Sequence, residues 1–403
     1  MKKVLWISLF IPYDNVRHAG GKIHNFYLKA LKASRQFDIK LLTFAEPADM
    51  EQQDLDKYRI EHDIICYDYS VIARLFRKII NAESTFNPYN RYGRALQNYD
   101  IIMIKKKVKE YVKNGYNPDV VILQWTQMVF LLPYIKKSFP KASFIAIEED
   151  VTYLSYERKM KYYPNAFLRY ISKVSFNKVK KLELKVLSSA DLVITNNHKD
   201  EKLIIKDGIS KNKIFVWTPF FQNYLKTERK YSNHNLIFYG GMGRQENYLS
   251  AIWFAENVMP KLKDTDVVFQ IVGANPDKRL YEYESDKIVI VGFVEQVEEY
   301  LSKALCLVAP LVFGAGVKIK VLESLSAGIP VLTNDVGIEG IDAIEDRDFF
   351  YCVTADEYEK CIRKLLSGEI DMKNISRNEK YFIQKHYNLN KSVEDFISYV
   401  NNL

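Results

Sequence analysis

The feature that most constrains the fold of this chain is the alternation of short apolar runs with longer stretches of helical character. A strand that is apolar throughout is buried on both faces, and alternation with helices places such strands in parallel sheets. The sequence therefore predicts an α/β protein with doubly wound sheets. The runs lie at residues 4–10, 39–44, 64–69, 120–125, 144–147, 192–195, 214–217, 236–239, 267–272, 288–291, 306–310, 330–333 and 350–353.

The length of the chain predicts two domains. Its 403 residues exceed what one hydrophobic core usually supports. The sequence becomes polar between Pro219 and His234, and a new apolar run follows directly. We therefore place an N-terminal domain at residues 1–221 and a C-terminal domain at residues 222–378. We expect two such halves to bind ligands in a cleft at the carboxyl ends of their strands.

Charge and cysteine content restrict the partners and the compartment. The formal net charge of +8 suits an anionic partner, and three classes fit: a nucleic acid, a phospholipid surface and a phosphorylated small molecule. The four cysteines are far apart and form no C-x-x-C pair, so we expect a reducing compartment. The apolar start of the chain is short and ends at Pro12, which favours a first buried strand over a signal peptide. We therefore expect a cytoplasmic protein.

One segment, residues 310–333, has the composition of an anion-binding turn. A strand ends at Pro310, a glycine-bearing loop follows, and we expect a helix from about Val317. The N–H groups and the dipole of a helix start attract anions. Gly314 and Gly316 would allow positive φ and a close approach of the backbone. The side chains that would contribute are the cations Lys318 and Lys320 and the carboxylate of Glu323, which can accept hydrogen bonds from sugar hydroxyls. A purely structural glycine loop is the alternative.

The same segment resembles the C-terminal signature of glycosyltransferase family four, also called glycosyl transferases group 1. The resemblance runs from about Leu236 to Gly340, and it includes residues 238–247, 269–276, 291–294 and 335–340. It implies the GT-B fold, in which two Rossmann-like domains face a central cleft. It also implies that a C-terminal helix, residues 379–403, crosses back to the N-terminal domain. The N-terminal half matches only loosely.

The resemblance implies roles for individual residues. In such enzymes helix-start N–H groups and two basic side chains hold the donor diphosphate, and a glutamate, here Glu323, holds the ribose. Arg244 fits one basic role, and Lys318 or Lys320 fits the other. A glutamate that the family often carries eight residues earlier is Ala315 here. The other positions that the resemblance assigns to donor binding are Gly20, Gly21, Gly240, Gly241, Gly273, Val294, Gly314, Gly316 and Val317.

Three consecutive acids, Glu148, Glu149 and Asp150, follow an apolar run. Catalytic groups of open α/β sheets lie at such carboxyl ends, and a clustered carboxyl with a raised pKa can act as a base. We expect Asp150, with Glu149 beside it, to serve the acceptor hydroxyl; an acidic helix start is the alternative. Asp264-Thr-Asp266 and Asp346-Arg-Asp348 read as surface turns. We expect no metal and no cofactor beyond the nucleotide diphosphate-sugar.

Two stretches combine basic and aromatic residues. Residues 158–181 contain eight basic residues and no acid, and residues 74–113 contain ten basic residues and three acids. This pattern is typical of segments that lie on anionic membranes. Solvated helix faces are the alternative, and no recognised nucleic-acid-binding motif accompanies the charge. The sequence thus favours peripheral contact with a membrane and no nucleic acid partner.

Taken together, the residues and the resemblance predict a glycosyltransferase. It would move a sugar from a nucleotide diphosphate-sugar to a hydroxyl of a glycan or lipid-linked acceptor, with retention, in the synthesis of a cell-surface polysaccharide or glycoconjugate. Two alternatives stay open. One is a non-hydrolysing sugar-nucleotide epimerase, and the other is a catalytically silent GT-B subunit that acts as a partner or scaffold.

Overall fold

The computed structural model describes residues 1–403 except 17, 163–164, 231–233 and 315, and except the side chains of residues 158, 159, 161 and 162. The chain forms two compact units, Met1–Thr218 with Leu389–Leu403, and Pro219–Asn388. The first unit therefore ends slightly before the expected boundary at residue 221. The returning segment begins at Leu389 rather than at 379, because α14 (Met372–His386) packs on α12 (Ile319–Ala327) within the C-terminal unit.

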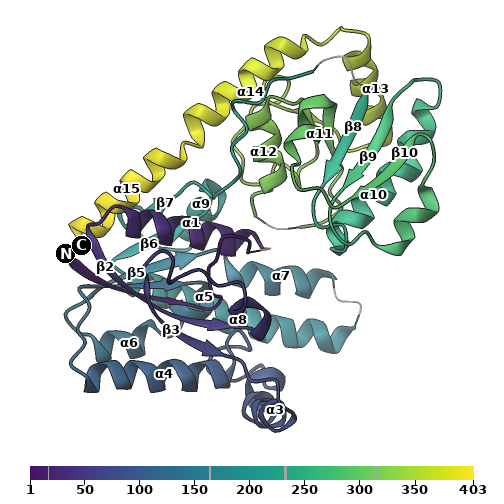
Figure 1. The fold of residues 1–403 in the computed structure, drawn as a ribbon. Helices are drawn as coiled ribbons and strands as arrows, with labels where there is room; N and C mark the ends of the chain where they lie inside the picture. The colour runs from purple at the N-terminus through teal and green to yellow at the C-terminus, as the bar shows by residue number, and fades with distance from the viewer. Residues whose placement is uncertain (17, 163–164, 231–233, 315) are drawn as a thin grey trace. The chain divides into compact units, whose positions relative to one another are not determined.

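The N-terminal unit is built on a seven-stranded parallel sheet with the strand order β3-β2-β1-β4-β5-β6-β7 (Figure 1). Strand β4 is buried at every residue, as expected of a strand covered by helices on both faces. The register pairs Val4 with Ile39 on one side and with Val120 on the other. The strands are β1 (Lys2–Ser8), β2 (Phe37–Ala45), β3 (Glu61–Cys66), β4 (Val120–Gln124), β5 (Ser143–Glu148), β6 (Leu192–Thr195) and β7 (Ile214–Val216).

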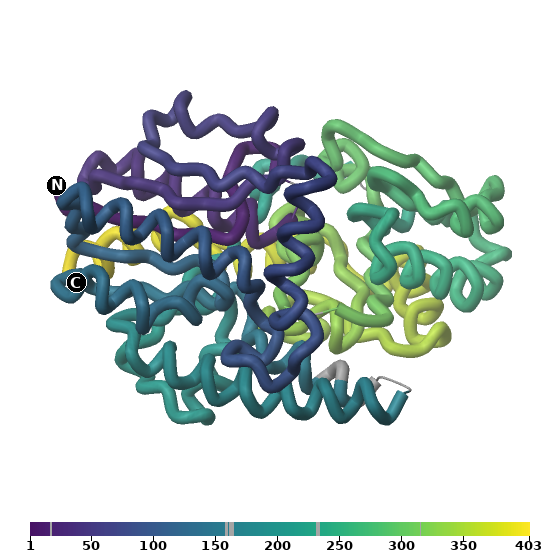
Figure 2. The backbone as a smooth tube through the Cα atoms, turned by 90° about the horizontal axis from the view of Figure 1, so that it is seen from below, coloured from purple at the N-terminus to yellow at the C-terminus, as the bar shows by residue number. Residues whose placement is uncertain are grey.

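Helices cover this sheet, and the last helix of the chain is one of them. Figures 1 and 2 show α15 (Leu389–Asn402), in yellow, alongside α1 (Ala19–Ala33). The Ser392 hydroxyl lies 2.5 Å from the Tyr27 hydroxyl, and the Phe396 ring packs on Tyr27 and Trp6. The other helices are α2 (Pro47–Met50), α3 (Val71–Phe86), α4 (Asn98–Lys113), α5 (Thr126–Val129), α6 (Leu132–Ser138), α7 (Thr152–Tyr162), α8 (Ala166–Ser189) and α9 (His198–Lys206).

The C-terminal unit is built on a six-stranded parallel sheet with the order β10-β9-β8-β11-β12-β13. Helix α10 (Gln245–Asn257) buries Ala251 and Phe254, and Pro260 lies in a separate short 3₁₀ turn, Met259–Leu262. The strands are β8 (Asn235–Tyr239), β9 (Val268–Val272), β10 (Ile288–Gly292), β11 (Ala304–Ala309), β12 (Val331–Thr333) and β13 (Phe350–Tyr351). The remaining helices are α11 (Glu298–Lys303), α12, α13 (Ala355–Leu366) and α14.

Each sheet has one point at which the strand order reverses. It lies between β1 and β4 in the N-terminal unit and between β8 and β11 in the C-terminal unit. Open α/β sheets bind ligands outside the carboxyl ends of the strands at such points. We therefore expect a ligand site at the carboxyl ends of the strands beside each of these two points. Among the described residues, no helix is both long enough and apolar enough to cross a bilayer.

Candidate active site

In the C-terminal unit two glycines bring the ends of β8 and β9 close together, beside the reversal point. Gly240 and Gly273 follow β8 and β9 with φ values of +151° and +148°. A Cβ atom on Gly273 would lie 1.6 Å from the Gly240 carbonyl oxygen. No side chain fits between backbones this close, so this approach requires glycine at position 273. Gly241 continues the turn, which leads to α10 through Arg244 at its N-cap.

Lys320, in the first turn of α12, is half-buried, and its amine lies close to this turn. Its Nζ donates a hydrogen bond to Asn247 Oδ1 at 2.7 Å and lies 4.2 Å from the centre of the Phe238 ring. A Cβ atom on Gly240 would approach that Nζ to 3.1 Å. Burial, followed by the positive charge of Arg244, lowers the pKa of the Lys320 amine to about 7. An anion bound at the turn would therefore stabilise the charged form of this amine.

Glu323 lies one turn further along the same face of α12. Its Oε2 accepts a hydrogen bond from the Tyr239 hydroxyl at 3.0 Å, and its Oε1 accepts one from the backbone N–H of Gln222 at 3.2 Å. Burial, followed by the charge of Glu323, raises the pKa of Tyr239 well above its usual range. Tyr239 therefore stays a neutral donor and holds the carboxylate in place.

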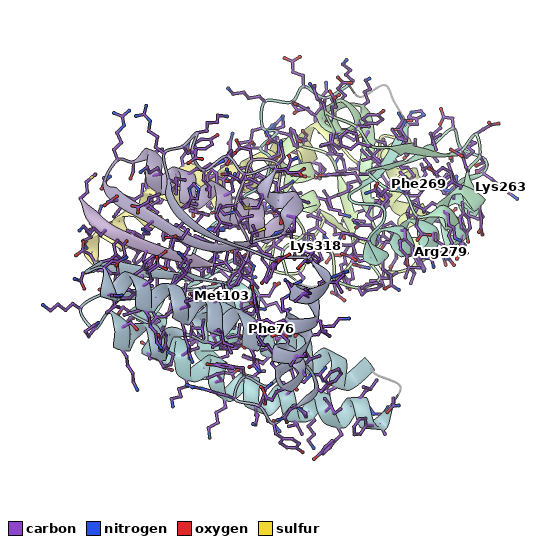
Figure 3. The ribbon with its side chains drawn as sticks, turned by 60° about the horizontal axis from the view of Figure 1, so that its bottom comes forward. Phe76, Met103, Lys263, Phe269, Arg279 and Lys318 are labelled. Carbon is purple, nitrogen blue, oxygen red and sulfur yellow. The ribbon has the colours of Figure 1, made fainter. Side chains whose placement is uncertain are left out.

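The glycine loop before α12 has the predicted character, but the helix begins later than expected. Gly314 and Gly316 have φ values of +150° and +70°, and α12 starts at Ile319, with Lys318 as its N-cap, rather than at Val317. The two left-handed glycines keep the chain non-helical up to that point. The Lys318 amine, labelled in Figure 3, donates to the Gly316 carbonyl and lies 3.5 Å from Glu339 Oε2. Position 315 lies outside the described residues.

The two remaining predicted donor contacts are less enclosed. The Arg244 side chain is 67% exposed and forms an ion pair with Glu246. Val294 is half-buried and follows β10, which is two strands away from β8 in the sheet. The structure thus gathers Lys320, Glu323 and the strand-end glycines at the reversal point, with Arg244 at its rim. It does not bring Val294 into this hydrogen-bonded cluster.

In the N-terminal unit the corresponding cluster is centred on Glu149. The Gln124 side-chain amide donates to Oε1, and the Asn196 amide donates to Oε2 at 2.8 Å. A Cβ atom on Gly20, at the start of α1, would lie 3.4 Å from both Glu149 Oε2 and Trp125 Nε1. Burial raises the pKa of Glu149 to about 8. This carboxyl can therefore hold or release a proton near neutral pH.

Aromatic rings line the same end of the N-terminal sheet. Trp125 directly follows β4 with a φ of +70°, and its ring meets those of Phe10 and His24 edge-on, with centroids 5.1 and 5.4 Å away. His18 caps α1, because its Nδ1 accepts the Gly21 N–H at 3.0 Å. A Cβ atom on Gly21 would lie 2.8 Å from the His18 ring, so Gly21 serves this packed cap.

The three consecutive acids point to three different environments. Asp150 is exposed in the turn after β5, Glu149 enters the polar cluster, and Glu148 is buried. Thr126 Oγ1 donates to Glu148 at 2.7 Å, and Glu183 of α8 accepts the backbone N–H groups of residues 152 and 153. Burial raises the pKa of Glu148, and burial followed by the charge of Glu148 raises that of Glu183.

Sequence reasoning missed several members of this cluster. Gln124 ends β4, Trp125 follows it, and Asn196 follows β6, so all three lie at carboxyl ends of strands. Their position at the carboxyl ends of predicted strands was the sequence signal that could have identified them as site residues. Glu183 lies in the middle of a long helix, and nothing in its local sequence distinguishes it from a solvated glutamate. Among the described residues, no group of three or more His, Cys, Asp or Glu side chains is placed to hold a metal ion.

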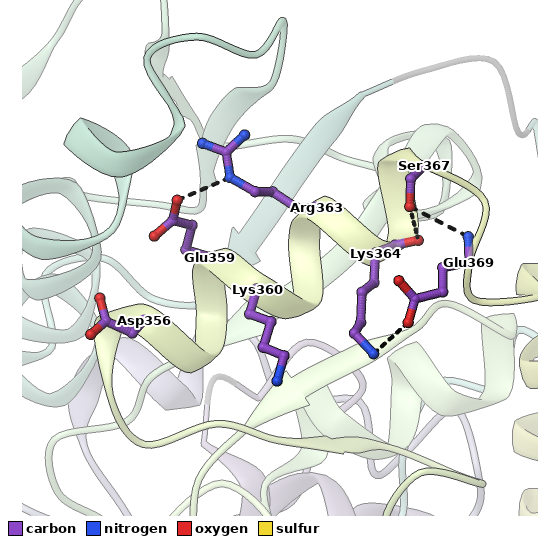
Figure 4. A pocket seen from close by; sticks show the side chains of 7 residues that line it. All are labelled: Asp356, Glu359, Lys360, Arg363, Lys364, Ser367 and Glu369. Carbon is purple, nitrogen blue, oxygen red and sulfur yellow. Dashed lines mark hydrogen bonds and ion pairs between the residues drawn. The ribbon is translucent and has the colours of Figure 1, made fainter.

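A surface pocket on the C-terminal unit contains none of the predicted site residues. It lies along α13, and two ion pairs join charged side chains of its lining (Figure 4). Arg363 pairs with Glu359 at 2.9 Å and with Asp264 at 2.7 Å, and Lys364 pairs with Glu369 at 2.5 Å. With these ion pairs, the pocket has the character of a charged outer helix face.

Comparison with known proteins agrees with this architecture. Residues 233–368 match the model of the family described as Glycosyl transferases group 1, which confirms the resemblance for the C-terminal unit. A protein of Klebsiella pneumoniae described as an uncharacterized 44.6 kDa protein in the cps region is 23% identical over 212 residues. That match covers 49% of this chain and 55% of the relative, so the chain spans about half the length of the curated relative.

Solved structures match the whole chain. Anabaena Alr3699/HepE in complex with UDP-glucose aligns over 100% of both chains with 11% identity and a TM-score of 0.65. Sucrose-phosphate synthase from Thermosynechococcus elongatus aligns over 100% of this chain and 99% of that chain, with 13% identity and a TM-score of 0.69. The predicted fold class is therefore confirmed: the chain has the GT-B fold of glycosyltransferases, with one parallel-sheet domain in each unit.

Proposed function

We propose that this protein is a glycosyltransferase that moves a sugar from a nucleotide diphosphate-sugar to an acceptor hydroxyl. The observation that carries the proposal is the cluster of Lys320 and Glu323 on one face of α12, at the reversal point of the sheet in the unit that matches the group 1 model. The amine and the helix start offer positive charge to a diphosphate, and the carboxylate offers acceptors to ribose hydroxyls.

The donor site is tested by thermal stabilisation of the full chain with a panel of UDP-, GDP- and ADP-sugars. One of them should raise the unfolding temperature, and Lys320→Ala and Glu323→Ala should each weaken that shift. Lys360→Ala and Glu369→Ala, which line the surface pocket along α13, are the matched controls and should leave it unchanged. If no nucleotide-sugar shifts the unfolding temperature of well-folded protein, a catalytically silent subunit becomes the better description.

We propose UDP-sugars as the first donors to test. Alr3699/HepE was solved with UDP and with UDP-glucose, and TarM of Staphylococcus aureus was solved with UDP and a sugar glycoside. These complexes support the class of donor for a protein of this fold. They do not choose the sugar, because sugar choice depends on side chains that differ at such low identity.

On the acceptor side we propose Glu149, in preference to Asp150, as the group that accepts or orients the acceptor proton. Its two oxygens are held by Gln124 and Asn196, and its raised pKa suits proton transfer near neutral pH. Asp150 is exposed, so water screens its charge. Glu149→Gln should lower turnover by about a hundredfold or more at unchanged donor affinity, and Asp150→Asn should have a much smaller effect. Equal losses of turnover from the two variants would instead support Asp150 as the group that serves the acceptor, as the sequence predicts.

For the stereochemistry we propose retention, without a metal ion. No covalent nucleophile is required if the acceptor attacks on the face from which the diphosphate leaves. The cationic groups at α12 then stabilise the charge on the leaving group. Product analysis by NMR decides the anomeric outcome, and activity in the presence of a chelator decides the metal dependence. Conversion of the donor in the absence of any acceptor would instead indicate a sugar-nucleotide epimerase.

We further propose a role in cell-surface polysaccharide or glycoconjugate synthesis, at the cytoplasmic face of a membrane. The relative encoded in a cps region of Klebsiella pneumoniae and the excess of basic residues support this setting. A glycan carried on an anionic lipid fits both observations as the acceptor class. Transfer of labelled sugar from the identified donor into a lipid-extractable product tests the acceptor, and labelled product that stays in the aqueous phase would exclude it.

A further inference from the structure

Helix α3 exposes an unusual amount of apolar surface. Of its described residues, Ser84 alone is buried. The exposed fraction of the residue is 82% for Ile72, 60% for Phe76 and 65% for Ile79, and Val71, Leu75 and Phe86 are also exposed. Residues 72, 75, 76 and 79 have the spacing of one helix face, so these side chains form a continuous apolar stripe.

The opposite face of α3 is anchored by polar contacts to the start of α4. Asn98 donates from its side chain to the Ile80 carbonyl at 3.2 Å, and its N–H donates to Ser84 Oγ at 3.1 Å. The N–H of Tyr99 donates to Asn81 Oδ1 at 2.8 Å. Figures 1 and 2 show α3 beside one end of α4 and pointing in a different direction. The helix is therefore held in place without burying its apolar stripe.

The exposed charges on α3 itself are mostly positive. Arg74 and Lys78 are both exposed on this helix. The single acid of α3, Glu83, accepts hydrogen bonds from Asn87 at 3.1 Å and from Asn98 at 3.3 Å. An exposed apolar stripe bordered by cations is the arrangement of a helix that lies in the surface of an anionic bilayer.

The other basic stretch, residues 158–181, is less available for such a role. Lys178 donates to the carbonyls of residues 89 and 90, and Lys180 forms an ion pair with Asp207 at 2.8 Å. Phe176 packs against the hydrophobic core of the N-terminal unit. Several of its residues thus stabilise the fold. The side chains of residues 158, 159 and 161 lie outside the described part of the chain.

We propose that α3 inserts its apolar stripe into the surface of an anionic lipid bilayer, with Arg74 and Lys78 at the lipid phosphates. Charge complementarity selects this occupant, because a second copy docked on the same face would bring cations against cations. This proposal rests on the proposed function, because membrane binding by α3 would bring the enzyme to a lipid-linked acceptor. Its test requires no transfer activity, so the two proposals can fail separately.

The experiment is vesicle flotation of the full chain. Vesicles of phosphatidylcholine alone are compared with vesicles that also contain phosphatidylglycerol, at low and at high salt. We expect binding to the anionic vesicles at low salt and much weaker binding to neutral ones. Phe76→Ser, at the residue labelled in Figure 3, should weaken partition by about tenfold. Tyr381→Ser, on α14 at 61% exposure, is the matched control and should leave partition unchanged.

A second pair of variants tests the charges. The double variant Arg74→Gln, Lys78→Gln should weaken binding to anionic vesicles by about twentyfold at low salt. The double variant Lys263→Gln, Lys360→Gln removes the same charge from the C-terminal unit and should have little effect. Equal losses from the two pairs would show that net charge alone causes binding, and they would overturn the assignment to α3.

Two further outcomes would overturn the proposal. One is failure of the unaltered protein to float with anionic vesicles at low salt. The other is a concentration-dependent dimer in sedimentation velocity that Phe76→Ser dissociates, which would make the stripe an interface between copies. Thermal stabilisation by the nucleotide-sugar is measured on each variant in parallel. A preserved shift shows that the variant is folded and that its donor site is intact.

Discussion

Lys320 gives the sharpest prediction, because its amine is charged only in part at neutral pH. Burial and the nearby Arg244 lower the pKa of this amine to about 7. A bound diphosphate favours the ammonium form, so donor binding above pH 7 must take up a proton. Between pH 6 and pH 8 the charged fraction of the free site falls by about tenfold, and the affinity for a nucleotide-sugar should fall by about the same factor, or about 1.4 kcal/mol.

The assay is calorimetric titration with a nucleotide-sugar at pH 6, 7 and 8. A nucleotide-sugar is preferable to a free nucleoside diphosphate, because a terminal phosphate itself titrates near pH 6. Titration in two buffers of different ionisation enthalpy measures the proton uptake directly. Lys320→Met should bind more weakly at pH 6 and lose the pH dependence. Lys360→Met, at an exposed position of α13, should behave like the unaltered protein.

One result would refute this reasoning. If the affinity is the same at pH 6 and pH 8, and Lys320→Met lowers it equally at both, the amine is charged throughout. Burial beneath Gly240 would then not control its pKa.

Two further predictions concern stability. Gly273→Ala should lower the free energy of unfolding in urea by about 2–4 kcal/mol, because its Cβ would collide with the Gly240 carbonyl oxygen. The control is Gly115→Ala, at φ +71° with open space around it, which should lower the free energy of unfolding by about 1 kcal/mol. Equal losses of stability from the two variants would contradict this steric argument. The raised pKa values of Glu148 and Glu183 mean that the folded state holds protons that the unfolded state releases above its ordinary carboxyl pKa. The free energy of unfolding should therefore fall as pH rises above about 5, by up to about 1.4 kcal/mol per pH unit for each proton held. Glu148→Gln should flatten that slope, and an unchanged slope in urea titrations from pH 5 to 9 would show that the Glu148 carboxyl holds no such proton.

The strands could be predicted from the sequence because their signal is local. Each of the thirteen apolar runs coincides with one strand, β1 to β13. The turn before α12 was also predictable, since its glycines, lysines and glutamate lie within a few residues of one another. Its start was misplaced by two residues, because only the backbone angles at Gly314 and Gly316 show where helical geometry begins.

The contacts between distant segments could not be predicted. Strand β5 ends at Glu148, and successive side chains beyond it enter different surroundings. Glu149 and Asp150 are therefore adjacent in the sequence, yet Glu149 is enclosed and Asp150 is exposed. The partners of Glu149 come from β4 and from the end of β6, and Glu183 comes from the middle of α8. The position of a residue in the sequence carries little information about such long-range contacts.

Direct binding of a nucleotide-sugar to the α12 cluster is the measurement that tests the central claim. Calorimetry of the full chain with the donor selected by the thermal panel should give one site per chain. Glu323→Gln should weaken binding by about five- to tenfold, through the hydrogen bonds to the ribose, whereas Glu369→Gln should not. Binding that both variants leave unchanged, or no binding by any nucleotide-sugar, would contradict the assignment of this cluster as the donor site.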